Sequence, residues 1–517
     1  MSNATTVGAA ASGAATASVT TTVDAAWAHQ QATSFSTDRA NRVARNAVTS
    51  MDVMPAARDY NHMRTYHETY SVELPHTGDI TNQRHSGRCW MFSAFNVARA
   101  ATIKLLDVET FEFSQAYGMF YDKLEKANAF LENIIRLADK PLDDRELMSV
   151  LSDGMGDGGY WVFAMNLIAK WSLVPKDVMP ETACSKASEQ MDAQLERLLR
   201  RDAAILRKAA AAGAGVEELQ AKKQELLSDV YKMLCICLGE PPAHFDFEVH
   251  VGKKCKVDAS KLEEVLPKDK KDEKTVGAKA DSADDDAKDD ATSKVDDVKR
   301  ILRDPHITPQ EFAQRYVPFD PHDYAEIVFM PSSTAKMNTV YHVRSIDSVE
   351  GGMKNRFLNV NQTVLEQAAI AQLKAGEPVS MACDVMQEFP RCIKDFNNVL
   401  ALDGLDLNGL FGMDLRMERT DMLDMGETCL THAMTFQGVE LDKNGEPVAW
   451  RVENSWGKDC GKDGYLYMTA DWFRTYGGEV IVRREFLPDE IRDLWNNAEA
   501  VDADPWSNIA RGLGACK

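Results

Sequence analysis

Apolar positions along the first half of the chain follow helical spacing. From Cys89 onward they recur without an intervening Gly or Pro until past Leu106, which predicts a long, buried helix that begins at Cys89. Helical patterns also dominate residues 163–241, where we expect two long helices around 195–212 and 217–238. The first half of the chain is therefore predicted to be mainly helical.

Short runs typical of β-strands gather toward the end of the chain, with one more predicted helix at 364–374. One run lies early in the chain, at 70–80. The others lie at 326–330, 341–345, 378–383, 433–439, 448–453 and 480–484. Helices and strands are thus segregated along the chain and do not alternate, which predicts the α+β fold class.

Two segments are predicted to stand outside the folded body. Residues 267–299 are mostly Lys, Asp, Ala and Ser without an aromatic residue, so they cannot bury enough apolar surface to offset their ordering entropy. We expect a disordered acidic loop there; the alternative is a charged segment that binds a partner. Residues 1–25, rich in Ala, Thr and Ser, lack the basic start and apolar run of a signal peptide and are predicted to be a flexible leader.

Composition and charge narrow the possible functions. The chain of 517 residues has a net charge of −21, which disfavours a nucleic-acid coat or a protein that binds anionic membranes. No run approaches the roughly 18 consecutive apolar residues of a membrane-spanning helix. The ten Cys are scattered, and Cys235-Ile236-Cys237 lacks a second ligand pair at zinc spacing. We therefore expect reduced thiols in a cytosolic protein without a metal or cofactor.

One of these thiols has a setting suited to catalysis. A Cys at a helix N-terminus feels the positive end of the helix dipole and unpaired backbone N–H groups, and both stabilise a thiolate. Gln83, six residues before Cys89, can place a side-chain N–H beside the Cys89 backbone N–H, and two such donors form an oxyanion hole. The alternative interpretation is a small core residue, which is the more common role of a Cys that opens a buried helix.

A histidine and an asparagine further along the chain complete a possible catalytic set. His432 stands at the entrance to an apolar, strand-like run, and Asn454 lies at a predicted strand end with Trp456 close enough to shield it. An Asn carbonyl can accept the far imidazole N–H and so fix the ring without a carboxylate. Each residue alone is more often structural, but Cys, His and Asn in this order are hard to obtain by chance.

Several short motifs, spread over nearly the whole chain from about residue 30, carry a family resemblance. They occupy residues 41–48, 86–90, 111–117, 157–161, 235–239, 431–435 and 450–457. With these motifs the chain resembles the papain superfamily and, within it, the bleomycin hydrolase and aminopeptidase C family of cysteine peptidases.

The resemblance implies a role for each candidate residue. Cys89 is the nucleophile, His432 the general base and then acid, Asn454 the residue that orients His432, and Gln83 the oxyanion donor, in a reaction that passes through a thioester. Trp456 covers the Asn454–His432 contact. His432 follows Cys89 by about 340 residues, whereas papain-like enzymes without insertions separate the two by some 130–150. The surplus matches a helical insertion.

The implied architecture is a papain-like two-lobe fold, a helical lobe plus a β-barrel-like lobe, with a large helical insertion between the Cys and the His. We expect the leader at 1–25, an N-terminal arm and the helical lobe with Cys89 at 26–165, the insertion with its acidic loop at 166–345, the β-rich lobe with His432 and Asn454 at 346–490, and a C-terminal arm that enters the active-site cleft at 491–517.

The resemblance also implies how substrate binds. Gly158 and Gly159 line the cleft along the substrate backbone, and the chain end meets the substrate's free α-ammonium, which makes the enzyme an aminopeptidase. The chain ends in Leu513-Gly514-Ala515-Cys516-Lys517, so Cys516 and Lys517 are candidate substrate-binding residues. If the enzyme trims its own Lys517, the carboxylate falls on Cys516. The alternative for this segment is a frayed tail.

The leading hypothesis is a cytosolic cysteine aminopeptidase that acts on short peptides with a free N-terminus. The resemblance further implies a ring-like homohexamer and bleomycin-type amide hydrolysis. An endopeptidase on the same scaffold is the first alternative, since a displaced arm is enough to produce it. A non-catalytic binding scaffold is a distant alternative, because all four catalytic positions are filled. Nucleic-acid binding is disfavoured by the charge.

Overall fold

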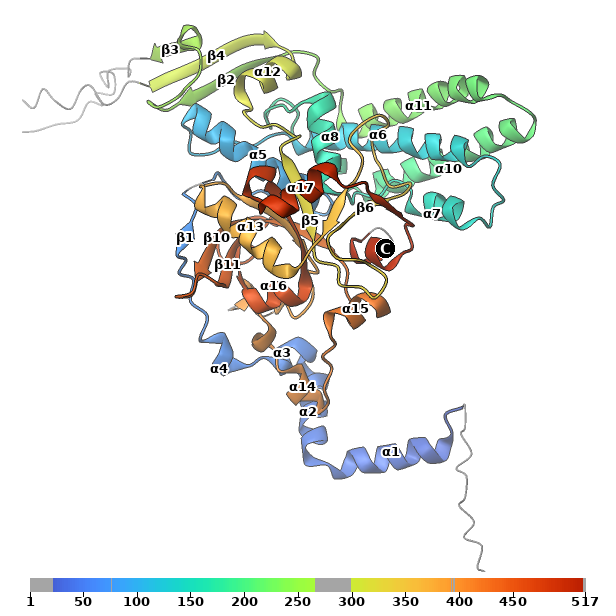
Figure 1. Ribbon diagram of the computed structural model, residues 1–517, viewed down its shortest axis with the longest axis vertical. Coiled ribbons are helices and arrows are strands. Elements are labelled where there is room, and N and C mark those ends of the chain that lie inside the picture. The colour runs from blue at the N-terminus through green and yellow to red at the C-terminus, as the bar shows by residue number, and fades with distance from the viewer. Residues whose placement is uncertain (1–21, 76, 266–298, 392, 394–395, 515–517) are drawn as a thin grey trace, which may run out of the picture. The chain divides into compact units, whose positions relative to one another are not determined.

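The computed structural model of the chain describes residues 22–75, 77–265, 299–391, 393 and 396–514 (Figure 1). These residues fall into two units. The first is the described part of Met1–Arg58 together with Asp406–Leu415, and the second is the described part of Asp59–Leu405 and Arg416–Lys517. Most of the predicted leader and all but the last residue of the predicted acidic loop lie outside the described residues.

The first unit is built from helices. They are α1 (Ala25–Thr37), α2 (Arg39–Met51), α3 (Val53–Ala57) and α14 (Leu407–Phe411). Asp38 separates the first two helices, since its carboxylate accepts from the backbone N–H groups of Ala40 and Asn41 and so starts α2. The two segments of this unit are joined where Asp406 N–H donates to the carbonyl of Ala57. Helices α1 and α2 bury none of their residues.

The core of the second unit is a mixed sheet of eleven strands. Its order is β14-β6-β7-β5-β13-β8-β10-β11-β12-β9, and β1 pairs with β10. The pairs β14–β6, β7–β5 and β12–β9 are parallel, and the others are antiparallel. The strands are β1 (Val72–Glu73), β5 (Tyr324–Val328), β6 (Thr339–Val343), β7 (Phe357–Asn359), β8 (Val379–Cys383), β9 (Val399–Leu400), β10 (His432–Leu441), β11 (Pro447–Glu453), β12 (Tyr465–Thr469), β13 (Gly477–Arg483) and β14 (Val501–Ala503).

The two faces of this sheet pack against different helices. Along β8, Met381 lies in a core with α13 (Gln362–Lys374) on one face. Its neighbour Ser380 turns to the other face, where its hydroxyl bonds with that of Ser93 in α5 (Cys89–Leu106) at 2.8 Å. The Ser93 hydroxyl also donates to the carbonyl of Met434 at 2.7 Å. The joint between α5 and the sheet is therefore a buried polar contact next to an apolar core.

Helices of different lengths dominate the chain from α5 to residue 238. They are α6 (Gln115–Arg136), α7 (Arg145–Asp153), α8 (Trp161–Trp171), α9 (Ala183–Lys186), α10 (Glu189–Ala211) and α11 (Val216–Leu238). Apolar side chains of α6, α10 and α11 form one core. The helices expected around 195–212 and 217–238 are thus confirmed, as are the start of α5 at Cys89 and the α+β class.

A second sheet, of three strands, was not predicted. Strands β2 (Phe245–Val251), β3 (Leu262–Val265) and β4 (Lys299–Ile307) form it in the order β2-β4-β3. Few of their side chains are buried, so the apolar alternation that marks a strand is weak. The strand expected at 70–80 was also too long, because only Val72–Glu73 form β1.

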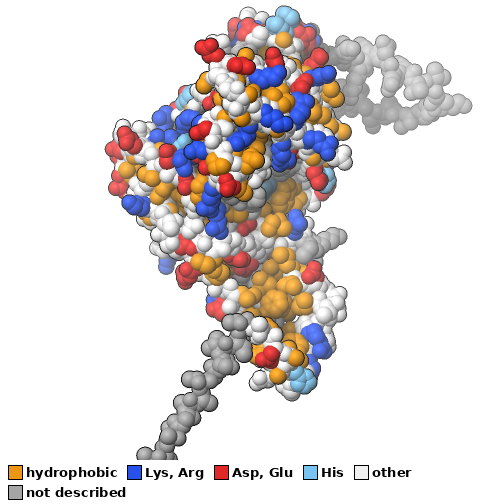
Figure 2. Space-filling view, turned by 90° about the vertical axis from the view of Figure 1, so that its right-hand side faces the viewer, with side chains coloured by type: hydrophobic (Ala, Val, Ile, Leu, Met, Phe, Trp, Pro, Cys, Tyr) orange, Lys and Arg blue, Asp and Glu red, His pale blue; other side chains and the backbone are white. Residues whose placement is uncertain are grey.

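Within these described ranges no helix is long and apolar enough to cross a membrane. On the face shown in Figure 2, acidic and basic side chains are interspersed.

Candidate active site

Cys89 is the first residue of α5 and is partly exposed. The turn before it is held by Arg88, whose side chain is almost fully buried. The Arg88 guanidinium donates to both carboxylate oxygens of Glu181, at 3.1 and 3.0 Å, and to the carbonyl of Ser185 at 2.7 Å. A bidentate pair fixes the direction of both groups, so Cys89 is presented on a rigid turn at the positive end of a helix dipole.

The loop that carries Gly87 packs closely against Asp157. The Gly87 N–H donates to Asp157 Oδ2 at 2.8 Å, and a Cβ on Gly87 would lie 2.9 Å from the Asp157 Cβ, so only glycine allows this approach. Burial opposes ionisation of Asp157, but the Lys123 ammonium, 2.8 Å from Oδ1, and hydrogen bonds from Ser188 and Gly87 together hold the pKa of Asp157 below its usual range. The carboxylate is therefore a permanent anchor for the turn before Cys89.

The amide of Gln83 is held at both ends. Its Nε2 donates to the Ser86 carbonyl at 2.7 Å, and its Oε1 accepts from the Ser455 hydroxyl at 2.6 Å. The Gln83 backbone N–H also donates to the Ser455 carbonyl at 2.8 Å. Because the Ser86 carbonyl can only accept, a turned-over amide would place Oε1 against it and lose that bond. One Nε2 hydrogen remains, and Gln83 lines the same cavity as Cys89.

His432 opens strand β10 and is 6% exposed. Its Nε2 lies 2.9 Å from Asn454 Oδ1, which leaves Nδ1 as the other ring nitrogen. Burial lowers the pKa of His432 to about 4, and the hydrogen bond to Asn454 opposes part of that shift. With this pKa the imidazole is neutral at neutral pH. The neutral ring is the form that can accept a proton.

Asn454 and Trp456 complete the surroundings of the His432 ring. Asn454 follows β11, is 1% exposed, and its Oδ1 also accepts from the backbone N–H of Ser455 at 2.7 Å. The Trp456 ring centroid lies 4.7 Å from that of His432. The bond between the ring and the amide is thus shielded from water on the side of the indole.

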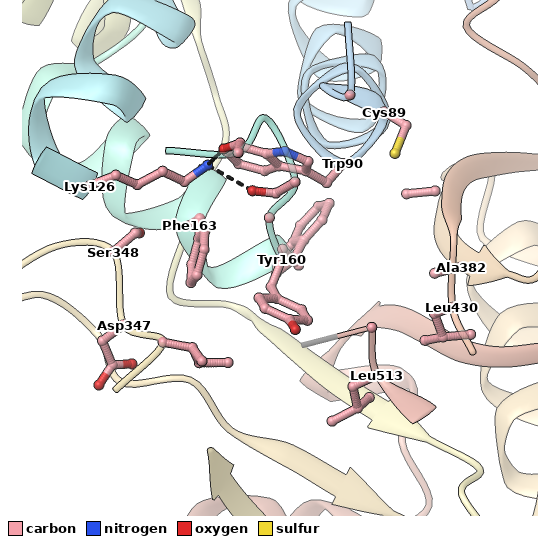
Figure 3. Close-up of a pocket in the computed structure, with 18 of the residues that line it drawn as sticks. Cys89, Trp90, Lys126, Tyr160, Phe163, Asp347, Ser348, Ala382, Leu430 and Leu513 are labelled. Atoms are coloured by element: carbon pink, nitrogen blue, oxygen red, sulfur yellow. Dashed lines mark hydrogen bonds between the residues drawn. The ribbon is translucent and has the colours of Figure 1, made fainter. Parts of the chain in front are cut away.

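One cavity of about 370 Å³ brings the predicted residues together. Gln83, Cys89, Gly158, Gly159 and His432 all line it. In Figure 3 the Cys89 sulfur faces the space between the helical side, with Trp90 and Tyr160, and the sheet side, with Ala382 and Leu430.

The remaining predicted residues are not among those that line the cavity in the described part of the chain. Asn454 and Trp456 reach the site through their contacts with His432. Cys516 and Lys517 lie outside the described residues; Leu513 and Gly514, which precede them, line the cavity.

Sequence reasoning did not identify several residues that shape the site. Ser455 lies within the motif at residues 450–457, but no neighbouring residue in the sequence indicated that it binds Gln83. Glu479 lines the cavity in an otherwise apolar run, and burial raises its pKa. Burial and the Glu479 carboxyl raise the pKa of Glu326, which lies nearby on the adjacent strand β5. A lone acidic residue inside a strand pattern was the available signal for this pair.

A thiol on a helix N-terminus and an imidazole held by an asparagine, both lining one cavity, define a cysteine hydrolase site of the papain type. The chain belongs to the peptidase C1-like family, whose sequence model matches residues 22–268 and 290–510.

Named relatives agree with this assignment. The chain is similar to aminopeptidase W of Lactobacillus delbrueckii subsp. lactis, with 35% identity over 475 residues, 92% of this chain and 96% of the relative. It is 34% identical to aminopeptidase C of Lactococcus lactis subsp. lactis, over 87% of this chain and 90% of the relative. The crystal structure of PepW from Lactobacillus rhamnosis HN001 superposes with a TM-score of 0.82 at 32% identity and covers 96% of this chain and 99% of that one. The predicted enzyme class, a cysteine-type aminopeptidase, is thereby confirmed.

Proposed function

We propose that the protein removes N-terminal residues from short peptides through a thioester on Cys89. The observation that carries the proposal is the 2.9 Å contact between His432 Nε2 and Asn454 Oδ1. His432 lines the same cavity as Cys89. Because Nε2 is taken by Asn454, Nδ1 is the nitrogen that receives the thiol proton. The resulting thiolate is stabilised by the imidazolium and by the helix N-terminus.

The steps follow from these positions. The Cys89 thiolate attacks the carbonyl carbon, and the oxyanion accepts from the Cys89 backbone N–H and the free Nε2 hydrogen of Gln83. The intermediate collapses as His432 gives its proton to the leaving amine, which leaves an acyl thioester on Cys89. His432 then takes a proton from water, which attacks the thioester and releases the acid. Asn454 keeps the ring in one orientation throughout.

Cleavage restricted to the N-terminus is supported by the course of the C-terminal segment. Leu513 and Gly514 line the cavity, and residues 515–517 follow them directly in the sequence. We propose that the terminal carboxylate, on Lys517 or on Cys516 after self-trimming, binds the substrate's α-ammonium while Gly158 and Gly159 bind its backbone. Intact mass of the active enzyme distinguishes the two ends.

The test compares a dipeptide amide with its N-acetylated twin, with and without residues 515–517. The full chain should cleave only the free amine, and the shortened chain should lose that preference. Equal rates on both substrates in the full chain indicate the endopeptidase instead. Conversion of Cys89→Ser must abolish hydrolysis; unchanged hydrolysis overturns the mechanism.

The proposal extends to a cytosolic homohexamer and to bleomycin-type amide hydrolysis. Support for assembly comes from the first unit, which leaves Trp27, Phe35, Val43 and Met51 exposed. Removal of residues 1–51 should lower the mass measured by light scattering, and an unchanged mass rules out this unit as the contact. Incubation with bleomycin, followed by mass spectrometry, tests the second activity.

A further inference from the structure

Lys126 directs its charge at a loop on the cavity wall. It lies on α6 and lines the cavity, although its side chain is only 11% exposed. Its ammonium donates to the carbonyls of Gly158 at 2.7 Å and Gly156 at 3.1 Å, and to Asp122 Oδ2 at 2.9 Å. Figure 3 shows this side chain reaching from α6 to the loop. An ammonium has three donors, so all three are used.

The loop that receives Lys126 is tied inward at four consecutive carbonyls. Lys123 donates to Met155 at 2.6 Å, Lys126 to Gly156 and Gly158, and the Trp90 indole N–H to Asp157 at 2.7 Å. Residues 154–160 form no helix or strand that would hold these groups otherwise. These three side chains, together with the contacts of the Asp157 carboxylate, set the course of the loop.

The same side chains join the loop to the helix of the nucleophile. Trp90 follows Cys89 directly, and the Lys126 ammonium lies 5.3 Å from the Trp90 ring centroid and 5.8 Å from that of Phe163. A Cβ on Gly159 would lie 2.5 Å from the Trp90 ring, so the loop packs directly on the indole. Lys126 thus lies where the loop, Trp90 and the cavity meet.

We infer that Lys126 is a positioning residue that holds the backbone of residues 156–159 in register with Cys89, so that a substrate backbone bound along Gly158 and Gly159 places its carbonyl at the sulfur. The inference rests on the proposed function, because it needs substrate to run along this loop. Without the ammonium, two carbonyls beside aromatic rings lose their donor and turn toward water. Substrate binding then weakens, while the thiol itself is unaffected.

The experiment compares Lys126→Met with Lys170→Met in the full-length enzyme. Lys170 is a matched control, because its ammonium also pairs with a carboxylate, Glu125 at 2.6 Å, and lies 5.4 Å from the Trp171 ring, but it is not a cavity residue. Three quantities are measured: kcat and KM on a free-amine dipeptide amide, amide hydrogen exchange across 154–160, and the rate of Cys89 alkylation by iodoacetamide.

For K126M we expect kcat/KM to fall at least about tenfold, mainly through KM, because two charge-assisted hydrogen bonds are lost. Exchange across 154–160 should accelerate, and alkylation should stay within about twofold, since a small neutral reagent does not use the loop. K170M should change none of the three. A folded K126M with unchanged KM and exchange overturns the inference.

A second variant covers loss of folding. If circular dichroism shows that K126M is unfolded, Lys126→Gln keeps an N–H donor in place of the charge and must show the same changes at smaller size; wild-type values in K126Q overturn the inference. Failure of the proposed function is separate, since it appears as an inactive wild-type enzyme or as an active C89S variant.

Discussion

Removal of the Ser455 hydroxyl should slow the enzyme only through Gln83. The hydroxyl donates to Gln83 Oε1 at 2.6 Å, and the two residues are 3% and 6% exposed. Ser455→Ala therefore leaves a buried carbonyl oxygen without its donor, which costs about 1–3 kcal/mol. If this cost is felt fully in the transition state, kcat/KM falls about 5- to 150-fold. Gln83→Ala, which removes the proposed oxyanion donor itself, should cost about 10²–10³-fold in kcat.

A double-mutant cycle separates this route from a general structural effect. In the Gln83→Ala background the Ser455 hydroxyl has no amide to orient, so adding Ser455→Ala should change kcat by less than about twofold. The assay is hydrolysis of a free-amine dipeptide amide. Ser332→Ala serves as control, because that buried hydroxyl donates to Asp424 at 2.7 Å and is not a cavity residue. Equal losses from Ser455→Ala in both backgrounds would refute the orienting role.

Three further perturbations test other parts of the structure. Burial raises the pKa of Glu479, so the folded protein is most stable at low pH, where Glu479 is neutral, and loses stability as the pH rises through the folded-state pKa. Glu479→Gln should therefore raise the melting temperature more at about pH 8 than at about pH 5. An equal gain at both pH values would contradict this. Arg99→Met leaves the buried Glu453 carboxylate without the guanidinium that lies 2.7 Å from it, and should lower the free energy of unfolding measured in urea by about 3–5 kcal/mol. Adding Glu453→Met should recover most of this loss. No recovery would count against the pairing. Trp456→Leu removes the ring 4.7 Å from His432 and should lower kcat/KM about tenfold by admitting water to the bond with Asn454, whereas an unchanged value would exclude a shielding role.

The places of Cys89 and His432 in the fold could be predicted because each residue stands in a short segment that defines its own surroundings. Cys89 opens a run with uninterrupted helical spacing, and His432 opens an apolar strand, so their places at element starts follow from neighbouring residues. Ser455 and Lys126 could not be found this way. The partner of Ser455 is 372 residues away, and Lys126 binds carbonyls 30 and 32 residues further on, so their roles exist only after folding.

The missed sheet has a related cause. Strand β4 mixes charged residues and a proline with its apolar positions, and its partners β2 and β3 bury few side chains. Its pairing is carried by backbone hydrogen bonds that any residue except proline can make. A pattern of apolar positions therefore cannot reveal it, whereas the large sheet, whose central strands are buried on both faces, was visible as apolar runs.

The distance along the chain between the thiol and its base has a consequence during synthesis. Cys89 leaves the ribosome about 340 residues before His432, which at 5–20 residues per second is roughly 20–70 s. For that time the thiol has neither its proposed base, His432, nor the Ser455 hydroxyl that bonds to Gln83. If the proposed mechanism holds, the nascent helical half cannot hydrolyse peptides until the strands that carry His432 and precede Ser455 have been made.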